Sequence, residues 1–391
     1  MSSTASPTPG PFAGLKIIDL TRVLAGPYCT MMLADFGAHV IKIEVPERGD
    51  DARHIGPFIE DKSTYFMSLN RGKRSIALNL KDDEDRKTFE ILLETADVVV
   101  ENYRPGAFDK LGYDWETLHK RYPSLILASA SGFGQTGPYS KRPAYDMVVQ
   151  AMGGIMSLTG HEGDPPTRVG SSIGDIGAGL FTAIGVASAL YHREKTGEAT
   201  RIDVAMLDCQ VAILENGIAR YLATGQIPGR LGSRHPSIAP FQAFATADRH
   251  IVIAAGNDIL FARMAKAIGE LDLIDDDRFA DNDLRRHNVD ALSEAMEKTL
   301  KTQPADHWLT VLEDAGIPSG PINNVEQVLQ DPQVIARNMV IQANDPDIGP
   351  IKMPGNPIKF SAFPDPSERA AAPALDGDRD AILSETDLPK A

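Results

Sequence analysis

Cysteine is scarce in this sequence: Cys29 and Cys209 are the only two among 391 residues. Both lie in apolar stretches, so we expect buried free thiols rather than a disulfide. No pair of histidines or cysteines has metal-ligand spacing such as H-x-x-x-H or C-x-x-C, so no metal site is predicted. A G-x-x-x-x-G-K loop is also missing, which argues against P-loop nucleotide chemistry.

Positive charge is limited as well, with 39 Lys and Arg residues against 54 Asp and Glu residues and a formal net charge of −15. A nucleic-acid partner is not expected, because phosphate backbones require a basic face. Apolar runs stay below the roughly 18 residues of a membrane span, so no membrane partner is expected either. The segment 1–10 has no basic and apolar signal pattern, which predicts a disordered tail and a cytoplasmic protein.

Strand-like and helix-like segments alternate over the first half of the chain, which is typical of a doubly wound parallel sheet. The fold class expected is α/β, with a large Rossmann-like domain over 11–224. A Gly- and Pro-rich linker opens a smaller α+β domain over 225–330, and 331–391 is expected to return to the large domain. The predicted strands are 15–20, 39–45, 75–80, 97–102, 124–131 and 201–206.

Ligands of such sheets bind outside the carboxyl ends of the strands, so we place the ligand crevice there. Basic residues gather around these predicted ends and suggest a site for a polyphosphate or a carboxylate. The sequence "GFGQTG" at 132–137 is a poor dinucleotide fingerprint, because it follows a late strand and prolines interrupt what comes next. The basic residues are Arg22, Arg48, Lys73, Arg74, Lys81, Arg104, Lys110 and Arg142.

Asp175 is the lone carboxylate of the Gly-rich stretch "RVGSSIGDIGAGL", just before a long helix expected to end at Gly197. One interpretation is an N-cap, in which the carboxylate accepts backbone N–H bonds. The other is a covalent nucleophile at a helix start, accessible among glycines. The two interpretations are compatible.

Several segments together resemble the class III (CaiB/BaiF) coenzyme A-transferases, in order and at matching spacings over about 11–360. They include "GLKIIDLTRVLAGPYCTMMLADFGAHVIKIE", "GDDAR", "LNRGKRSIALNL", "ADVVVENYRPGAFDKLG" and "VGSSIGDIGAGLFTAIGVASAL". Later segments such as "GIPSGPINN" look most like the succinyl-CoA:dicarboxylate (glutarate) branch. The resemblance implies an interlocked homodimer. It also implies that Asp175 attacks an acyl-CoA thioester to give an aspartyl anhydride and then an aspartyl-CoA thioester. Coenzyme A and carboxylic acids are then substrates, and no cofactor is bound permanently.

The resemblance also carries over contacts with coenzyme A. Formyl-CoA transferases have Gln in place of Leu24, which argues against formyl or oxalate specificity. An Arg of the family falls on Val45, which makes Arg48 the candidate substitute, and Lys110 replaces another. The carried-over contacts are Leu24, Ala25, Leu78, Lys81, Asn102, Lys110, Arg142 and Tyr145. Candidates for binding anionic groups of the ligand are Arg22, Arg104, Arg234 and His235. Of these, Arg22, Arg234 or His235 is the candidate for a distal carboxylate of the acyl group.

Two other functions stay open. The family contains acyl-CoA racemases, whose His–Asp pair moves an α proton. Here Tyr145 replaces that His before Asp146, which favours transfer over racemisation, while both residues still shape the site. A catalytically inactive CoA-binding protein is the third possibility, and it predicts that Asp175→Ala changes no measured behaviour.

Overall fold

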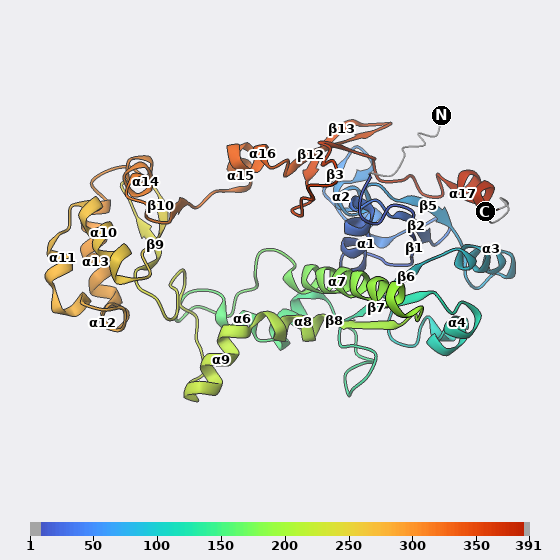
Figure 1. The fold of residues 1–391 in the computed structure, drawn as a ribbon, viewed down its shortest axis with the longest axis horizontal. Helices are drawn as coiled ribbons and strands as arrows, with labels where there is room; N and C mark the ends of the chain where they lie inside the picture. The colour runs from blue at the N-terminus through green and yellow to red at the C-terminus, as the bar shows by residue number, and fades with distance from the viewer. Residues whose placement is uncertain (1–8, 387–391) are drawn as a thin grey trace. The chain divides into compact units, whose positions relative to one another are not determined.

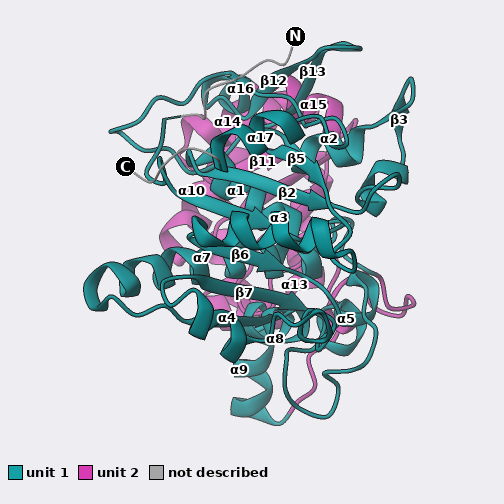
Figure 2. Ribbon diagram, turned by 90° about the vertical axis from the view of Figure 1, so that its right-hand side faces the viewer, with its two compact units in different colours: residues 1–156, 168–225, 332–391 teal, residues 157–167, 226–331 magenta. Residues whose placement is uncertain are grey.

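The computed structural model describes residues 9–386. The chain forms two compact units, which Figure 2 colours separately. Unit 1 comprises residues 1–156, 168–225 and 332–391, and unit 2 comprises residues 157–167 and 226–331. The segment 157–167, which the sequence assigned to the large domain, therefore groups with unit 2. The tail expected at 1–10 lies almost entirely outside the described residues.

Unit 1 is built on a six-stranded sheet of order β5-β2-β1-β6-β7-β8, in which every neighbouring pair is parallel (Figure 1). Numbered by their order in the sequence, these six strands run 3-2-1-4-5-6, the order of the Rossmann fold. The predicted parallel sheet is confirmed. The strands are β1 (Lys16–Asp19), β2 (His39–Glu44), β5 (Arg74–Ala77), β6 (Val98–Glu101), β7 (Ile126–Ser131) and β8 (Arg201–Ala205).

Successive residues of a strand point to opposite sides of the sheet, so each face carries its own apolar residues. Helices cover both faces and bury these residues. Ile18 and Val99 belong to one hydrophobic cluster, with residues of α3 (Asp83–Glu94), α4 (Trp115–Arg121) and α17 (Arg379–Thr386). Ile17 and Val98 belong to the other, with residues of α1 (Ala25–Asp35) and α7 (Ile173–Thr196). Val98–Val100 of β6 form an uninterrupted apolar run because both faces of the strand are buried.

The helix α7 has 24 residues and ends as predicted at Gly197, which adopts a positive φ of 77°. By length and composition alone it could cross a membrane, which corrects the expectation that no stretch is long and apolar enough. Within unit 1 one side of it, including Ala183, Val186 and Ala189, packs in the hydrophobic core. A Cβ at Gly179 would lie 2.7 Å from the carbonyl oxygen of Ala25, so small residues allow α1 and α7 to approach closely.

Two helices with a break between them follow β8. Residues 207–224 form α8 (Met206–Ile213) and α9 (Glu215–Thr224), which meet at Leu214. Asn216 and Gly217 follow the junction and have low helix propensity, which favours a break there. Cys29 and Cys209 are buried free thiols, as expected.

The last part of the chain packs on unit 1 at the edge strand β5. Asp378 Oδ2 accepts a hydrogen bond from Ser75 N at 2.9 Å, and Asp376 Oδ1 accepts one from Ala77 N at 2.7 Å. These bonds satisfy backbone donors that an edge strand would otherwise expose. The further elements of unit 1 are η1 (Asp51–His54), β3 (Phe58–Ile59), β4 (Lys62–Ser63), α2 (Thr64–Asn70), η2 (Asp109–Leu111), α5 (Asp146–Met152), α16 (Pro332–Ala336), β12 (Val340–Asp345), β13 (Gly349–Pro354) and β14 (Glu368–Arg369).

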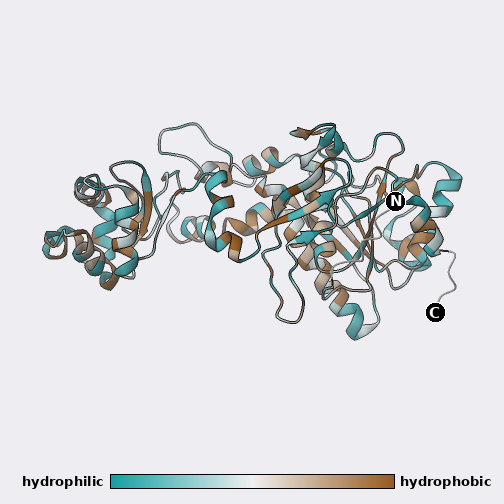
Figure 3. Ribbon diagram, turned by 90° about the horizontal axis from the view of Figure 1, so that it is seen from above, coloured by the Kyte–Doolittle hydropathy of each residue, from teal (hydrophilic) through white to brown (hydrophobic). Residues whose placement is uncertain are grey.

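Unit 2 contains an antiparallel sheet of order β11-β10-β9, in which the stretch "FQAFATADRHIVIAAGN" forms a hairpin. Its helices carry both hydrophobic and hydrophilic residues (Figure 3), and hydrophobic residues of the helices at 258–268, 272–275, 289–300 and 305–314 pack in one cluster with the sheet. The elements are β9 (Phe241–Ala245), β10 (His250–Ala254), α10 (Asp258–Ile268), α11 (Asp272–Asp275), η3 (Asp277–Phe279), α12 (Asn282–His287), α13 (Val289–Leu300), α14 (Ala305–Asp314), β11 (Ser319–Pro321) and α15 (Val325–Gln330), while α6 (Ile155–Leu158) spans a boundary between the units.

Candidate active site

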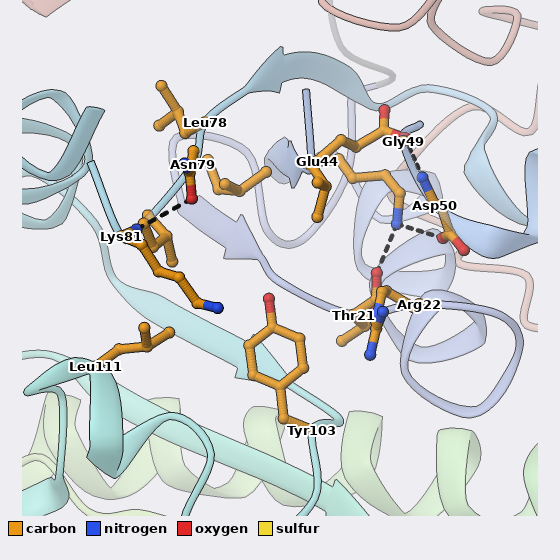
Figure 4. Close-up of a pocket in the computed structure, with 14 residues that line it drawn as sticks. Thr21, Arg22, Glu44, Gly49, Asp50, Leu78, Asn79, Lys81, Tyr103 and Leu111 are labelled. Atoms are coloured by element: carbon orange, nitrogen blue, oxygen red, sulfur yellow. Dashed lines mark hydrogen bonds and ion pairs between the residues drawn. The ribbon is translucent and has the colours of Figure 1, made fainter. Parts of the chain in front are cut away.

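A first pocket, of about 150 Å³, opens at the carboxyl ends of β1, β2, β5 and β6. This edge is the topological switch point of the sheet, where the chain runs outward in one direction from β1 and in the other from β6. Lys81 extends toward the space into which the hydroxyl of Tyr103 points (Figure 4). Of the predicted contacts, Arg22, Leu78 and Lys81 line it. The other lining residues are Thr21, Lys42, Ile43, Glu44, Val45, Gly49, Asp50, Asn79, Leu80, Tyr103 and Leu111.

Arg22 and Asn102 join the two loops at the switch point. Arg22 N donates to Asn102 Oδ1, and Asn102 Nδ2 donates to Arg22 O, each at 2.8 Å. The guanidinium of Arg22 lies 5.5 Å from the centre of the Tyr103 ring and 3.4 Å from Asp51. Nearly half of this side chain is exposed, so the guanidinium is available to an anionic ligand.

Other predicted basic residues do not line this pocket. Arg48 is largely exposed and pairs with Asp51 at 2.9 Å, whereas Val45 does line the pocket. Arg104, on the loop after β6, and Lys110, in η2, are exposed and do not line it either. Lys73, which was counted with the basic cluster, is fully buried and pairs with Asp19 at 3.0 Å. The predicted cluster therefore divides into residues that face the pocket and residues that serve the fold or the surface.

Asp175 is the third residue of α7, which begins at Ile173. The N-cap position belongs to Ser172, so the N-cap interpretation of Asp175 is wrong. The helix begins earlier because Asp146, in α5, accepts a hydrogen bond from Gly174 N at 2.8 Å and so supplies a capping acceptor from outside the helix. Within residues 9–386, the carboxylate of Asp175 has no hydrogen-bond or ion-pair partner.

The electrostatic surroundings of Asp175 disfavour its charge. Burial and, second, the negative charge of Asp146 raise the pKa of Asp175 to about 7. Gln150 Nε2 donates to Asp146 Oδ2 at 2.7 Å, and Gln150 Oε1 accepts from Val169 N at 2.9 Å. This chain of hydrogen bonds fixes Asp146 beside the first turn of α7. A carboxylate with few solvating groups is available to attack an electrophilic carbon.

A second pocket, of about 330 Å³, begins beside Asp175, since its neighbours Ser172 and Ile176 line it. Tyr65 lines it too, and burial, followed by the charge of Asp175, raises the pKa of Tyr65 to about 12. Arg71 donates to both carboxylate oxygens of Asp35, at 3.2 and 2.7 Å. The remaining lining residues are Leu24, Tyr28, Met31, Met32, Ser68, Leu69, Ser171 and Pro354 to Pro357.

Sequence reasoning did not single out Tyr65 or Arg71. Arg71 stands in the segment "LNRGKRSIALNL", which carried the resemblance, but a buried arginine and a surface arginine look alike in one sequence. Their positions alone could have drawn attention to them: Tyr65 lies in an apolar helix that leads into a predicted strand, and Arg71 directly follows that helix. That position places them near the sheet edge without showing which way they point.

The other predicted residues have partners of their own. The guanidinium of Arg142 lies 4.6 Å from the ring centre of Tyr139 and 5.8 Å from that of Phe133. Tyr145 is the exposed N-cap residue of α5, and Ala25 is the buried first residue of α1. In unit 2, Arg234 pairs with Asp290 at 2.5 Å, and His235 stacks on Phe241 with ring centres 5.1 Å apart.

Comparison with known proteins decides the family. The protein-family model described as CoA-transferase family III matches residues 12–379. The chain belongs to CoA-transferase family III. It is therefore a CoA-transferase, whose substrates are coenzyme A thioesters and carboxylic acids. The crystal structure of a CaiB/BaiF family protein from Brucella suis has a TM-score of 0.86 and 40% identity, and the match covers 97% of this chain and 100% of that one.

Two curated relatives of this CoA-transferase differ in their named substrates. The acetyl-CoA:oxalate CoA-transferase of Acetobacter aceti is 49% identical, with all of both chains covered. The succinyl-CoA:glutarate CoA-transferase of Homo sapiens is 41% identical, covering 90% of this chain and 81% of that one. The two relatives thus share a CoA-transferase name but differ in the named donor and acceptor.

Proposed function

We propose that this enzyme moves coenzyme A from an acyl-CoA, with succinyl-CoA as the preferred donor, to a second carboxylic acid, with Asp175 as the nucleophile. The observation that carries the proposal is the unpartnered, half-buried carboxylate of Asp175 in the first turn of α7, beside a pocket large enough for a small acid. The first pocket, with Arg22 and Lys81, is suited to the phosphates of coenzyme A.

Each chemical step is an acyl transfer. The Asp175 carboxylate attacks the thioester carbon, the C–S bond breaks, and an aspartyl–acyl anhydride and CoA thiolate form. The thiolate attacks the aspartyl carbonyl, releases the donor acid and leaves an aspartyl-CoA thioester. The acceptor carboxylate attacks that thioester, and the thiolate released then takes the new acyl group, which frees Asp175. The intermediates stay reactive, so the site must exclude water.

A dicarboxylate is the favoured class of acid. The names of both relatives include at least one dicarboxylate, namely oxalate, succinate or glutarate. In the second pocket Arg71 is almost fully buried and donates to Asp35, which also lines the pocket, and to Ser68 O. The N–H groups that its planar guanidinium has left match carboxylate geometry. Arg71 is therefore our candidate for the distal carboxylate, and Arg22, Arg234 and His235 remain the alternatives from the sequence.

The test is incubation with succinyl-CoA or acetyl-CoA and a panel of mono- and dicarboxylic acids, with the CoA esters followed by mass spectrometry. We expect exchange of CoA between acids, and a hydroxylamine-trapped adduct on Asp175 that Asp175→Asn lacks. Transfer at the wild-type rate by Asp175→Asn would refute the mechanism. Deuterium incorporation at the α carbon without any CoA exchange would instead indicate a racemase.

We also propose that the enzyme is a cytoplasmic homodimer with interlocked chains. In support, α7 exposes the apolar side chains Leu180, Phe181, Ile184 and Tyr191, a row that unit 1 does not cover. Light scattering of the purified protein should give twice the mass of one chain. A monomeric mass at micromolar concentration would rule the homodimer out.

A further inference from the structure

The segment Thr21–Leu24 separates the two pockets. Thr21 and Arg22 line the first pocket, and Leu24 lines the second. Val23, between them, has a φ of 67°, in the left-handed region. A β-branched residue rarely adopts this conformation, and it persists only where the surroundings hold it. A ligand that spans both pockets must pass this strained segment.

Two buried charged residues, Lys42 and Asp50, form hydrogen bonds with the backbone of this segment. Asp50 Oδ1 accepts a hydrogen bond from Val23 N at 3.0 Å, and Lys42 Nζ donates to Thr21 O at 2.7 Å. Lys42 Nζ and Asp50 Oδ2 pair at 2.8 Å, with both side chains fully buried. One ion pair thus holds two backbone groups, Thr21 O and Val23 N, on the amino-terminal side of the strained residue's Cα.

Both groups of this pair are charged. Burial opposes the charge of Lys42, but Asp19, Asp50 and Glu44 together raise its pKa. Burial likewise opposes the charge of Asp50, but Lys42 and backbone donors lower its pKa. A buried ion pair is weak evidence for stability, because an apolar pair of the same volume often serves a fold equally well. The contacts with Thr21 and Val23 give this pair a more specific role.

The segment leads directly into contacts beside Asp175. Ala25, the first residue of α1, packs in one buried cluster with Ala178, which lies one turn after Asp175 in α7. The carbonyl oxygen of Ala25 lies so close to Gly179 that no Cβ would fit without a shift. A change in the backbone at Val23 would therefore move the start of α1 against the start of α7.

We infer that Lys42 and Asp50 are positioning residues for the transfer reaction: they hold Val23 in its left-handed conformation, and so fix the backbone between the CoA pocket and Asp175. The inference rests on the proposed function. Neither residue touches the reacting atoms, and both act through the segment Thr21–Leu24. The role belongs to the motif "GDDAR", in which Asp50 is the first aspartate.

The experiment uses the full-length enzyme and measures kcat and KM for CoA transfer from succinyl-CoA. Asp50→Asn keeps the side-chain shape but weakens the pair with Lys42, and we expect kcat to fall by about 10- to 100-fold with a smaller change in KM, since a small misplacement costs about that much. The double variant Val23→Gly, Asp50→Asn should recover most of the lost kcat, because glycine adopts this φ without support.

Asp97→Asn is the matched control. Asp97 accepts from Lys16 N at 2.8 Å and pairs with Arg193 at 2.8 Å, but it lies at the opposite, amino-terminal edge of the sheet. We expect it to lower stability and leave kcat unchanged. If Asp50→Asn does not fold, the same comparison is made with Lys42→Arg, which keeps the charge and changes the geometry.

The outcomes separate this inference from the proposed function. A wild-type enzyme that transfers no CoA, while a trapped adduct on Asp175 is also absent, would overturn the proposed function. An active wild type with a fully active Asp50→Asn would overturn only the positioning role. So would a loss of kcat that Val23→Gly fails to restore, since the pair would then act by some route other than the conformation of Val23.

Discussion

Asp175→Asn should make the protein inactive and more stable at neutral pH. Its folded pKa of about 7, against 3.8 for the free side chain, means that the folded state disfavours the charged carboxylate. The loss in free energy of unfolding that the charged carboxylate causes is therefore absent below pH 4, grows as the pH rises toward 7 and is constant above it. A shift of about three units corresponds to about 4 kcal/mol. Losing a favourable charge near the start of α7 offsets this by about 0.5–1 kcal/mol, which leaves about 3 kcal/mol.

The assay is thermal unfolding of wild type and variant between pH 4 and pH 8. With an unfolding entropy of about 2.1 cal/mol/K per residue, 3 kcal/mol raises Tm by about 4 °C at pH 8, and the two curves should converge near pH 4. Asp208→Asn is the matched control, because Asp208 is the third residue of α8 and is exposed. The reasoning is refuted if Asp175→Asn leaves Tm unchanged at pH 8, or if its gain persists undiminished at pH 4.

Three further predictions concern the surroundings of the nucleophile. Asp146→Asn removes the neighbouring charge, so the acid limb of the pH profile of kcat/KM, governed by Asp175, should move below pH 7; an unmoved limb would exclude this coupling. Arg71→Leu should raise KM for dicarboxylate acceptors by about 10-fold or more while acetate is little affected, as steady-state kinetics with both acids would show. Gly179→Ala should destabilise the protein by about 1–3 kcal/mol in urea unfolding, because a Cβ there meets backbone at 2.7 Å, whereas Gly170→Ala, which meets nothing within 4 Å, should not.

The parallel sheet was predictable because the sequence pattern that indicates each strand and helix lies within that element itself. Strands buried on both faces, such as Val98–Val100, are short uninterrupted apolar runs, and the helices between them show their own period. The ligand edge then follows from topology, since parallel strands bring their carboxyl ends to one side. For this reason Arg22 and Lys81 could be named as pocket residues before any side chain was placed, whereas Leu78 was named only through the family resemblance.

Features that depend on contacts between distant segments were not predictable. The start of α7 was misplaced because its capping acceptor, Asp146, lies 28 residues earlier in another helix. The buried Lys73 forms an ion pair with Asp19, which lies in β1. The buried Arg71 likewise forms an ion pair with Asp35, which lies in α1. In each case the residue type was visible in the sequence, but its partner was set by the tertiary fold.

The misplaced helix start also explains how Asp175 can act as a nucleophile. An Asp at an N-cap accepts backbone hydrogen bonds that favour its charge, which lowers its pKa and occupies its oxygens. Here Asp146 accepts the bond from Gly174, so both oxygens of Asp175 stay free of partners among the described residues. Burial and the charge of that same neighbour raise the pKa of Asp175. The sequence offered Asp175 both as the capping residue and as the nucleophile. In the structure Asp146 supplies the capping acceptor, and Asp175 remains the candidate nucleophile. It follows that changing Asp146 would affect both the start of the helix and the ionisation of Asp175, whereas changing Asp175 would leave the helix start intact.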